Sequence, residues 1–242
     1  MTNEHIARAF DRDLEAVQAM IMKMGGLVET ALADAARALE AQDETLADQV
    51  RANDAAIDAL EEQVNGECAR LIALRAPMGT DLRIVLSVMK IASNLERCGD
   101  YAKNLAKRSK VLAGLAPIPE ANGSLKRMGR AVNLLLKDAL DAFIARDAGL
   151  AAEVRLRDHD IDQMYNALFR ELLTHMLEDS RKITPAMQLH FIAKNIERVG
   201  DHATTIAEQV IYMTTGSLPG DARPKVDAVQ GLSQGAPLGG QA

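Results

Sequence analysis

The chain has 242 residues, a formal net charge of −6 at pH 7 and a pI near 5.4. This length can bury a substantial core in one or two domains, and the acidic balance argues against a nucleic-acid backbone as the main partner. Hydrophobic residues make up 48% of the chain but aromatic residues only 3%, with no tryptophan, so the core must be aliphatic.

Apolar residues recur with the 3.6-residue period of an α-helix almost throughout the chain, which predicts an all-α protein. The first helix is expected over about 3–41. The second is capped by Asp43 and ends before Pro77, and the third begins near Thr80. The segment 114–119, Gly-Leu-Ala-Pro-Ile-Pro, is the clearest break in the pattern and the expected linker between domains.

The second half repeats this plan with three more helices. One is expected over roughly 123–146, and the next runs from the capping residue Asp147 to about residue 178. The last covers 184–215 and opens with a Thr-Pro pair, a favourable start because proline suits the first helical turn. The sequence therefore predicts six long helices, three in each half.

Short connections make consecutive helices antiparallel, which predicts two tandem antiparallel three-helix bundles. We expect the first bundle over residues 1–116 and the second over 117–216. Residues 217–242 are rich in Gly, Pro and Gln and lack periodicity, so this tail is expected to be disordered. Gly25 and Gly26, inside the first helix, indicate either a bend or a tight crossing with another helix.

The cysteines and the lack of targeting signals favour a cytoplasmic location. Cys68 and Cys98 do not form a disulfide framework or a Cys-x-x-Cys pair, which is typical of a reducing compartment. Neither a secretion signal nor an uncharged run of about 18 apolar residues is seen. We therefore expect contact with a membrane only through partners.

The two halves are related by an internal duplication. At an offset of 104 residues, nearly half of the positions between 24 and 58 are identical. The offset has fallen to 101 by the second block of similarity, which indicates one small insertion or deletion. A unit of about one hundred residues is too long for a solenoid repeat and indicates two similar halves of domain size.

A nine-residue motif marks this second block. It reads Asn-Leu-Glu-Arg-Cys-Gly-Asp-Tyr-Ala at 94–102 and Asn-Ile-Glu-Arg-Val-Gly-Asp-His-Ala at 195–203. Each copy carries a glutamate and an aspartate four residues apart, which a helix places on one face. Such like-charge pairs destabilise a helix by roughly 0.2–0.5 kcal/mol each, so we expect something positive between the acids.

Each half adds an Asp-x-x-x-Asp pair on its middle helix. Four carboxylates from two neighbouring helices can converge on one locus, as in metal-binding bundles. Carboxylates with few histidines suit hard cations such as Mg²⁺, Mn²⁺, Ca²⁺ or ferric iron. A di-iron oxidase would need Glu-x-x-His, but Gly99 and Gly200 occupy that third position. The candidate metal ligands are Asp54, Asp58, Glu96 and Asp100 in the first half and Asp158, Asp162, Glu197 and Asp201 in the second.

The residues around the first motif resemble the PhoU family of bacterial phosphate-signalling regulators. The motif continues as Asn-Leu-Glu-Arg-x-Gly-Asp-Tyr-Ala-x-Asn-Leu-Ala and is preceded by Ala-Pro-x-x-x-Asp-Leu-Arg at 76–83. The resemblance covers about residues 6–215 and includes both repeats. It implies a duplicated three-helix bundle whose eight acids, divided into two loci as above, can bind multinuclear iron or zinc clusters.

The resemblance also implies a function and partners. It implies negative regulation of the phosphate-starvation (Pho) response and of phosphate uptake, in the service of phosphate homeostasis. In that role the protein links the ATPase subunit of the phosphate-specific ABC transporter (PstB) to the sensor histidine kinase PhoR. A homodimer is the expected assembly.

The second half departs from this pattern. His202 stands where the first motif has Tyr101, and Thr205 replaces Asn104. The entry segment 181–185 lacks the Pro-x-x-x-Asp-Leu-Arg form. We therefore expect the halves to differ in metal occupancy or in partner contacts.

Three functions remain open from the residues: a regulatory adaptor, a metal-storage protein or metal-dependent enzyme, and a structural scaffold whose acids are a solvated surface. Arg97 and Arg198 could form surface ion pairs, hold phosphate or orient the acids. Asn94 and Asn195 could bond an adjacent helix or act as ligands. Because no nucleophile, positioned base or substrate loop is visible, we do not expect an enzyme and favour the regulator.

Overall fold

The computed structural model describes residues 2–220, with side chains from residue 9 onward. This part of the chain is helical and contains no strand, which confirms the predicted all-α class of two three-helix bundles. A short 3-10 helix, η1 (Ser180–Lys182), joins the fifth helix to the sixth. The six helices are α1 (Thr2–Ala41), α2 (Glu44–Arg75), α3 (Thr80–Ala113), α4 (Pro119–Ala145), α5 (Ala148–Glu178) and α6 (Ile183–Thr215).

Aspartate caps fix the starts of α2 and α5, as the sequence predicted. The Asp43 Oδ1 atom accepts a hydrogen bond from the Leu46 N–H at 2.9 Å. Asp147 Oδ1 accepts one from the Gly149 N–H at 2.8 Å, so both caps satisfy amides that have no partner within the helix. The start of α4 differs from the prediction, because the helix begins at Pro119 rather than near residue 123. Proline is well suited to that first position, where no intrahelical N–H bond is required.

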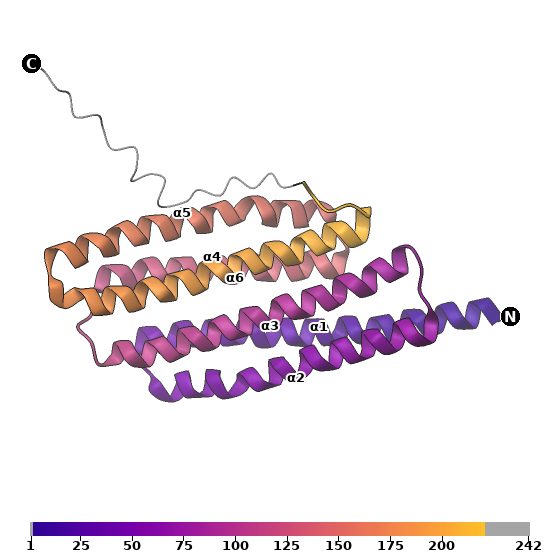
Figure 1. Ribbon diagram of the computed structural model, residues 1–242, viewed down its shortest axis with the longest axis horizontal. Coiled ribbons are helices and arrows are strands. Elements are labelled where there is room, and N and C mark those ends of the chain that lie inside the picture. Colours follow the sequence, from indigo (N-terminus) through magenta and orange to yellow (C-terminus); the bar gives the residue numbers. More distant parts are fainter. Residues whose placement is uncertain (1, 221–242) are drawn as a thin grey trace, which may run out of the picture.

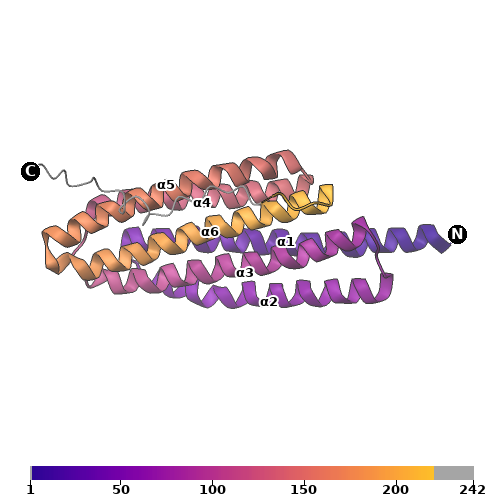
Figure 2. The same cartoon turned by 45° about the horizontal axis from the view of Figure 1, so that its top comes forward.

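The helices form two antiparallel three-helix bundles, α1–α3 and α4–α6 (Figure 1). The bundles pack through two pairs of helices, α1 against α4 and α3 against α6, and α3 and α6 run side by side in both views (Figure 2). Helices α2 and α5 flank this arrangement on opposite sides. In residues 2–220, α2 contacts only α1 and α3, and α5 only α4, α6 and η1.

One aliphatic core continues through both bundles. Its buried residues come from all six helices, and Phe143 is the one aromatic residue among the largest fully buried side chains of the described chain. The connection 114–118 between the bundles is short, and Ile118 within it is buried. The disorder predicted for 217–242 concerns residues that, beyond 220, lie outside the described part of the chain.

The crossing of α1 and α4 explains one of the two glycines in α1. A Cβ atom at Gly25 would lie 2.5 Å from Cδ1 of Leu140, whereas one at Gly26 would meet nothing within 4 Å. Of the two predicted roles for this pair, the structure therefore supports a tight crossing, and Gly25 is the residue that allows it. None of the helices in residues 2–220 combines the length and the apolar character that a bilayer span requires.

Candidate functional site

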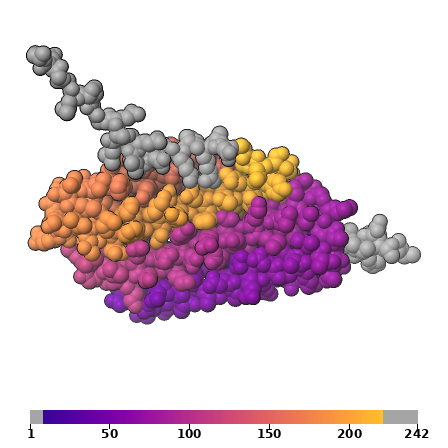
Figure 3. Space-filling model, in the orientation of Figure 1, coloured from indigo at the N-terminus to yellow at the C-terminus, as the bar shows by residue number. Residues whose placement is uncertain are grey.

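The two copies of the motif lie next to each other, although 101 residues separate them in sequence. Nδ1 of His202 on α6 lies 2.7 Å from Oδ1 of Asn94 on α3, and the rings of His202 and Tyr101 are 5.6 Å apart. Arg198 donates a hydrogen bond of 3.5 Å to the Tyr101 hydroxyl. The antiparallel packing of α3 and α6 thus brings the motifs together, and in Figure 3 the orange-to-yellow surface of α6 lies along the magenta surface of α3.

The asparagines that open the motifs behave differently. Asn94 bonds the adjacent helix through His202, one of the two roles predicted for it. The side-chain amide nitrogen of Asn195, its counterpart, is buried without a hydrogen-bond partner. The first motif's asparagine thus has a partner on the other bundle, in His202, whereas the amide nitrogen of the second motif's asparagine has none.

The first acidic group lies between α2 and α3. Asp54 is only 4% exposed, and one of its oxygens forms an ion pair with the Lys103 ammonium group. The same ammonium lies 3.7 Å from an oxygen of Asp100. The other Asp54 oxygen, Oδ1, is buried and has no hydrogen-bond partner. Lys103 is therefore the positive group between the acids in this half.

Gly99 allows α2 to approach α3 at this point. A Cβ atom there would lie 3.0 Å from Cδ1 of Ile57 and 3.4 Å from Oδ1 of Asp54. The contact with Ile57 is tighter than a core normally holds, so even alanine would force that side chain to move. The glycine of the motif is thus explained by helix packing beside the buried carboxylate.

Electrostatic coupling links the four acids of the first half. Burial, followed by the charges of Asp54 and Asp100, raises the pKa of Asp58 above its ordinary value. Burial, followed by the charge of Asp100 and then Asp58, raises the pKa of Glu96, and Arg97 opposes this. The four predicted residues therefore share one negatively charged locus.

The second acidic group repeats this arrangement between α5 and α6. Asp158 is buried, and a Cβ atom at Gly200 would lie 2.7 Å from its Oδ1 atom. Burial raises the pKa of Glu197, as do the charges of Asp201 and Asp162, while a hydrogen bond from Lys194 lowers it. In this second quartet of predicted ligands, Glu197 is therefore coupled to Asp201 and Asp162, and Asp158 lies against Gly200.

The counter-charge occupies different positions in the two halves. Lys194, one turn before Glu197 on α6, donates a hydrogen bond of 2.6 Å to its Oε1 atom. In the first half the lysine follows the motif, and Thr204 stands at the position equivalent to Lys103. Neither lysine was among the residues predicted from the sequence. Their spacing of three residues from an acid on the same helix was the available signal, but it is also common among solvated ion pairs.

The donor chemistry of the quartets suits a cation, but their arrangement in this conformation does not form a metal site. Among the residues whose side chains are described, no three Asp, Glu, His or Cys side chains are placed to hold one metal ion. Lys103 and Lys194 already partner Asp54 and Glu197. A metal could therefore enter only if these lysines moved aside, and metal binding stays a prediction.

The arginines of the motifs act mainly as surface groups. Arg97 lies 3.7 Å from Glu96 and 3.9 Å from Asp100, with most of its side chain exposed. Exposed pairs of this length contribute about 0–1 kcal/mol. Arg198 binds Tyr101 in the other half, so it supports the contact between the two bundles.

Exposed apolar side chains gather at the tips of the two outer hairpins. At the α2–α3 tip, Leu74 is 63% and Met78 is 83% exposed. At the α5–α6 tip, Leu177 is 87% and Ile183 is 45% exposed. The tips lie at opposite ends of the molecule (Figure 1). The duplication therefore produces two separate apolar surfaces that a partner could cover.

Comparisons with known proteins agree with the duplicated architecture. The PhoU domain matches the chain twice, over residues 21–109 and 125–210. A protein of Caulobacter vibrioides described as a "Phosphate-specific transport system accessory protein PhoU homolog" is 42% identical over 226 residues, which cover 93% of this chain and 98% of that protein. A Rhizobium meliloti protein with the same description is 44% identical over 96% of this chain and 98% of its own length.

Solved structures resemble the whole fold. The crystal structure of PhoU from Pseudomonas aeruginosa has a TM-score of 0.82 and 39% sequence identity, covering 86% of this chain and all of that one. The phosphate transport system regulatory protein PhoU from Streptococcus pneumoniae has a TM-score of 0.79 and 32% identity, covering 87% of this chain and 99% of that one.

Proposed function

Because the chain belongs to the PhoU domain family, we propose that it regulates phosphate transport as an accessory protein of a phosphate-specific transport system. The observation that carries this proposal is the identity of 42–44% with proteins of that description, over almost their full length. Both repeats and both acidic motifs lie within the matched region, so the likeness includes the candidate site.

More specifically, we propose a negative regulator of the phosphate-starvation response and of phosphate uptake. It would act in the cytoplasm as an adaptor, without enzymatic activity, between the ATPase subunit of the transporter and the sensor histidine kinase. The two apolar tips support this role, because Met78 and Leu177 lie at opposite ends of the molecule and two partners could contact them at once. A homodimer remains our expected assembly.

A deletion strain tests the regulatory proposal. Cells that lack the protein should express alkaline phosphatase even in high-phosphate medium, and the wild-type gene should restore repression. If the deletion strain still repressed alkaline phosphatase in high-phosphate medium, the protein would not be a negative regulator.

Substitutions at the tips test the adaptor geometry. Met78→Glu and Leu177→Glu should each fail to restore repression, because a charge in a desolvated contact is costly. Leu156→Glu is the matched control, since Leu156 is equally exposed but lies within α5, away from both tips. If all three variants restored repression, the tips would not be docking surfaces.

We also propose that the eight carboxylates bind metal, as iron or zinc clusters. The support is that burial, and after it the charge of neighbouring acids, raises the pKa of Glu96 and of Glu197, and a bound cation would neutralise that charge. The Glu96→Ala/Asp100→Ala variant should lose the metal of the first half, measured by elemental analysis of purified protein. Unchanged metal content would show that the ligands are wrong.

Metal should also stabilise the fold, because a ligand that binds only the folded state raises its stability. The melting temperature should therefore rise when Mn²⁺, Zn²⁺ or iron is added to metal-free protein. A storage protein or metal-dependent enzyme is the alternative, and it would leave phosphatase expression unaffected by the deletion.

A further inference from the structure

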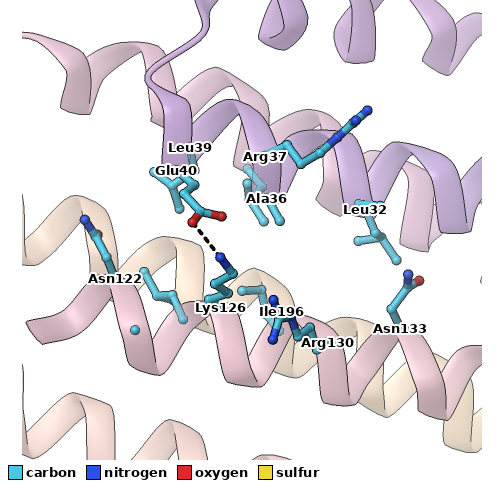
Figure 4. A pocket seen from close by; sticks show the side chains of 15 residues that line it. Leu32, Ala36, Arg37, Leu39, Glu40, Asn122, Lys126, Arg130, Asn133 and Ile196 are labelled. Carbon is cyan, nitrogen blue, oxygen red and sulfur yellow. Dashed lines mark hydrogen bonds and ion pairs between the residues drawn. The ribbon is translucent and has the colours of Figure 1, made fainter. Parts of the chain in front are cut away.

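A cavity of about 410 Å³ lies between the C-terminal half of α1 and the N-terminal half of α4. This is the α1–α4 seam between the bundles, and none of the eight predicted carboxylate ligands lines it. Its apolar lining includes Leu32 and Ala36 of α1 and Ile196 of α6 (Figure 4). Leu125 of α4 also lines it. The volume falls within the range of ligand pockets, about 300–1,000 Å³.

The duplication explains why this seam is hollow. The crossing of α1 and α4 has two equivalent positions, because each helix is the counterpart of the other at an offset of 104 residues. At one position Gly25 faces Leu140, whose side chain fills the space tightly. At the other, Gly129 stands in place of Gly25 and Ala36 in place of Leu140, and both line the cavity.

A second pair of equivalent residues adds to this difference in side-chain volume between the two positions. Leu39, in the wall of the cavity, is the counterpart of the fully buried Phe143. The filled position therefore has a leucine and a phenylalanine where the hollow one has an alanine and a leucine. The smaller side chains leave the apolar wall of the hollow position without contacts that the filled position makes. A ligand that occupied the space would recover that contact energy.

The hollow position has also gained positive charge. Lys126 is the counterpart of Met22, and Arg130 is the counterpart of Gly26. Lys126 reaches across to α1, where its Nζ atom lies 2.5 Å from Oε1 of Glu40 (Figure 4). Arg130 has no hydrogen-bond or ion-pair partner among the described side chains, although it lines the cavity.

Two groups in the wall are therefore ready for a polar ligand. The Arg130 guanidinium can bind an oxyanion in bidentate geometry. Oδ1 of Asn133, one turn further along α4, is buried and lacks a hydrogen-bond partner. Arg37 contributes little, because it points away from α4 and pairs with Asp34 (Figure 4).

We propose that this cavity binds a small organic anion, with an apolar body against the leucines and a terminal phosphate or carboxylate on Arg130. A hydroxyl or amino group of the ligand would donate to Asn133. The ligand would contact α1 of the first bundle together with α4 and α6 of the second, so its binding would hold the two bundles together. This site is separate from the carboxylate quartets and does not depend on the regulatory role.

A ligand-observed NMR titration of the full chain tests the proposal. The probes are 1-naphthyl phosphate and 1-naphthoate, which carry a phosphate and a carboxylate, respectively, on the same flat apolar body. The probe that binds more tightly identifies the oxyanion that the site prefers. Inorganic phosphate has the oxyanion without the apolar body, and 1-naphthol has the apolar body without the oxyanion. Each should therefore bind at least about tenfold more weakly than the naphthyl anions. Absence of binding by both naphthyl anions would overturn the proposal.

Three variants locate the binding. Ala36→Leu copies the filled position, which the fold already accommodates at Leu140, so it should abolish binding without lowering the melting temperature. Arg130→Gln should lower the affinity for both naphthyl anions about tenfold or more and leave the affinity for 1-naphthol unchanged. Arg127→Gln, an exposed neighbour on α4 that does not line the cavity, is the control. Undiminished binding to Ala36→Leu would place the ligand elsewhere and refute the site.

Discussion

The ion pair between Lys103 and Asp54 gives the most direct test of the acidic locus. In Lys103→Met the aliphatic part of the side chain is retained while the ammonium group is lost. Asp54 would then be a buried carboxylate with neither oxygen bonded, because Oδ1 already lacks a partner. The nearby charges of Asp58 and Asp100 would add repulsion.

The size of the effect follows from the exposure of the two partners. Removing one member of a fully buried ion pair costs about 3–5 kcal/mol. Asp54 is 4% exposed, but the Lys103 side chain is 42% exposed and its charge is screened by water. We therefore expect a smaller loss, of about 2 kcal/mol in the free energy of unfolding. For a chain of this length, that corresponds to a fall of roughly 4–8 °C in the melting temperature.

Thermal and urea unfolding of metal-free protein measure this loss. Lys107→Met is the matched control, since Lys107 is an exposed lysine one turn further along α3. Adding Asp54→Asn to the Lys103→Met variant should recover part of the stability, because the uncompensated charge is removed. If Lys103→Met melted at the same temperature as Lys107→Met, Lys103 would not neutralise the buried acid.

Three further predictions concern the core and its ionisable groups. Gly25→Ala should be less stable than Gly26→Ala by at least about 1 kcal/mol in urea unfolding, because only the first new methyl group collides with Leu140; equal stabilities would refute the tight crossing. Burial raises the pKa of Glu197 above its ordinary 4.5, so its ionised form destabilises the fold. The stability gained in Glu197→Gln should therefore be small below pH 4.5 and grow toward neutral pH, and a gain that shrank over that range would contradict the sign of the shift. Burial also raises the pKa of the Cys98 thiol, so this cysteine should react with a thiol reagent only on unfolding, and rapid labelling of the native protein would show that it is accessible.

The helices could be predicted from the sequence because their signals are local. Asp43 and Asp147 cap the helices at which they were expected, since a cap needs only a side chain and an amide two or three residues away. The missed start of α4 has a similarly local cause. The prediction placed it at Gly123, but Pro119 opens the helix and the residues between them are helical.

The candidate site could be predicted only in part. Spacing placed each acid pair on one face of a helix, and the structure brings the two pairs of each half together. The partners of Asp54 and Glu197 were not predictable, because many lysines lie at suitable spacings and packing decides which of them reaches a carboxylate. The role of Gly99 and Gly200 also required the positions of Asp54 and Asp158 on the facing helices.

The amino-acid sequence by itself determined the six helices, the duplication and the identity of the acidic motifs, because periodicity, caps and repeated spacings are written along one chain. Only the tertiary structure decided how the copies meet. It placed Asn94 against His202 across two antiparallel helices, and it left Ala36 opposite Gly129 where Leu140 fills the equivalent space. Contacts of this kind depend on side chains from distant segments filling a shared volume, which no local pattern specifies.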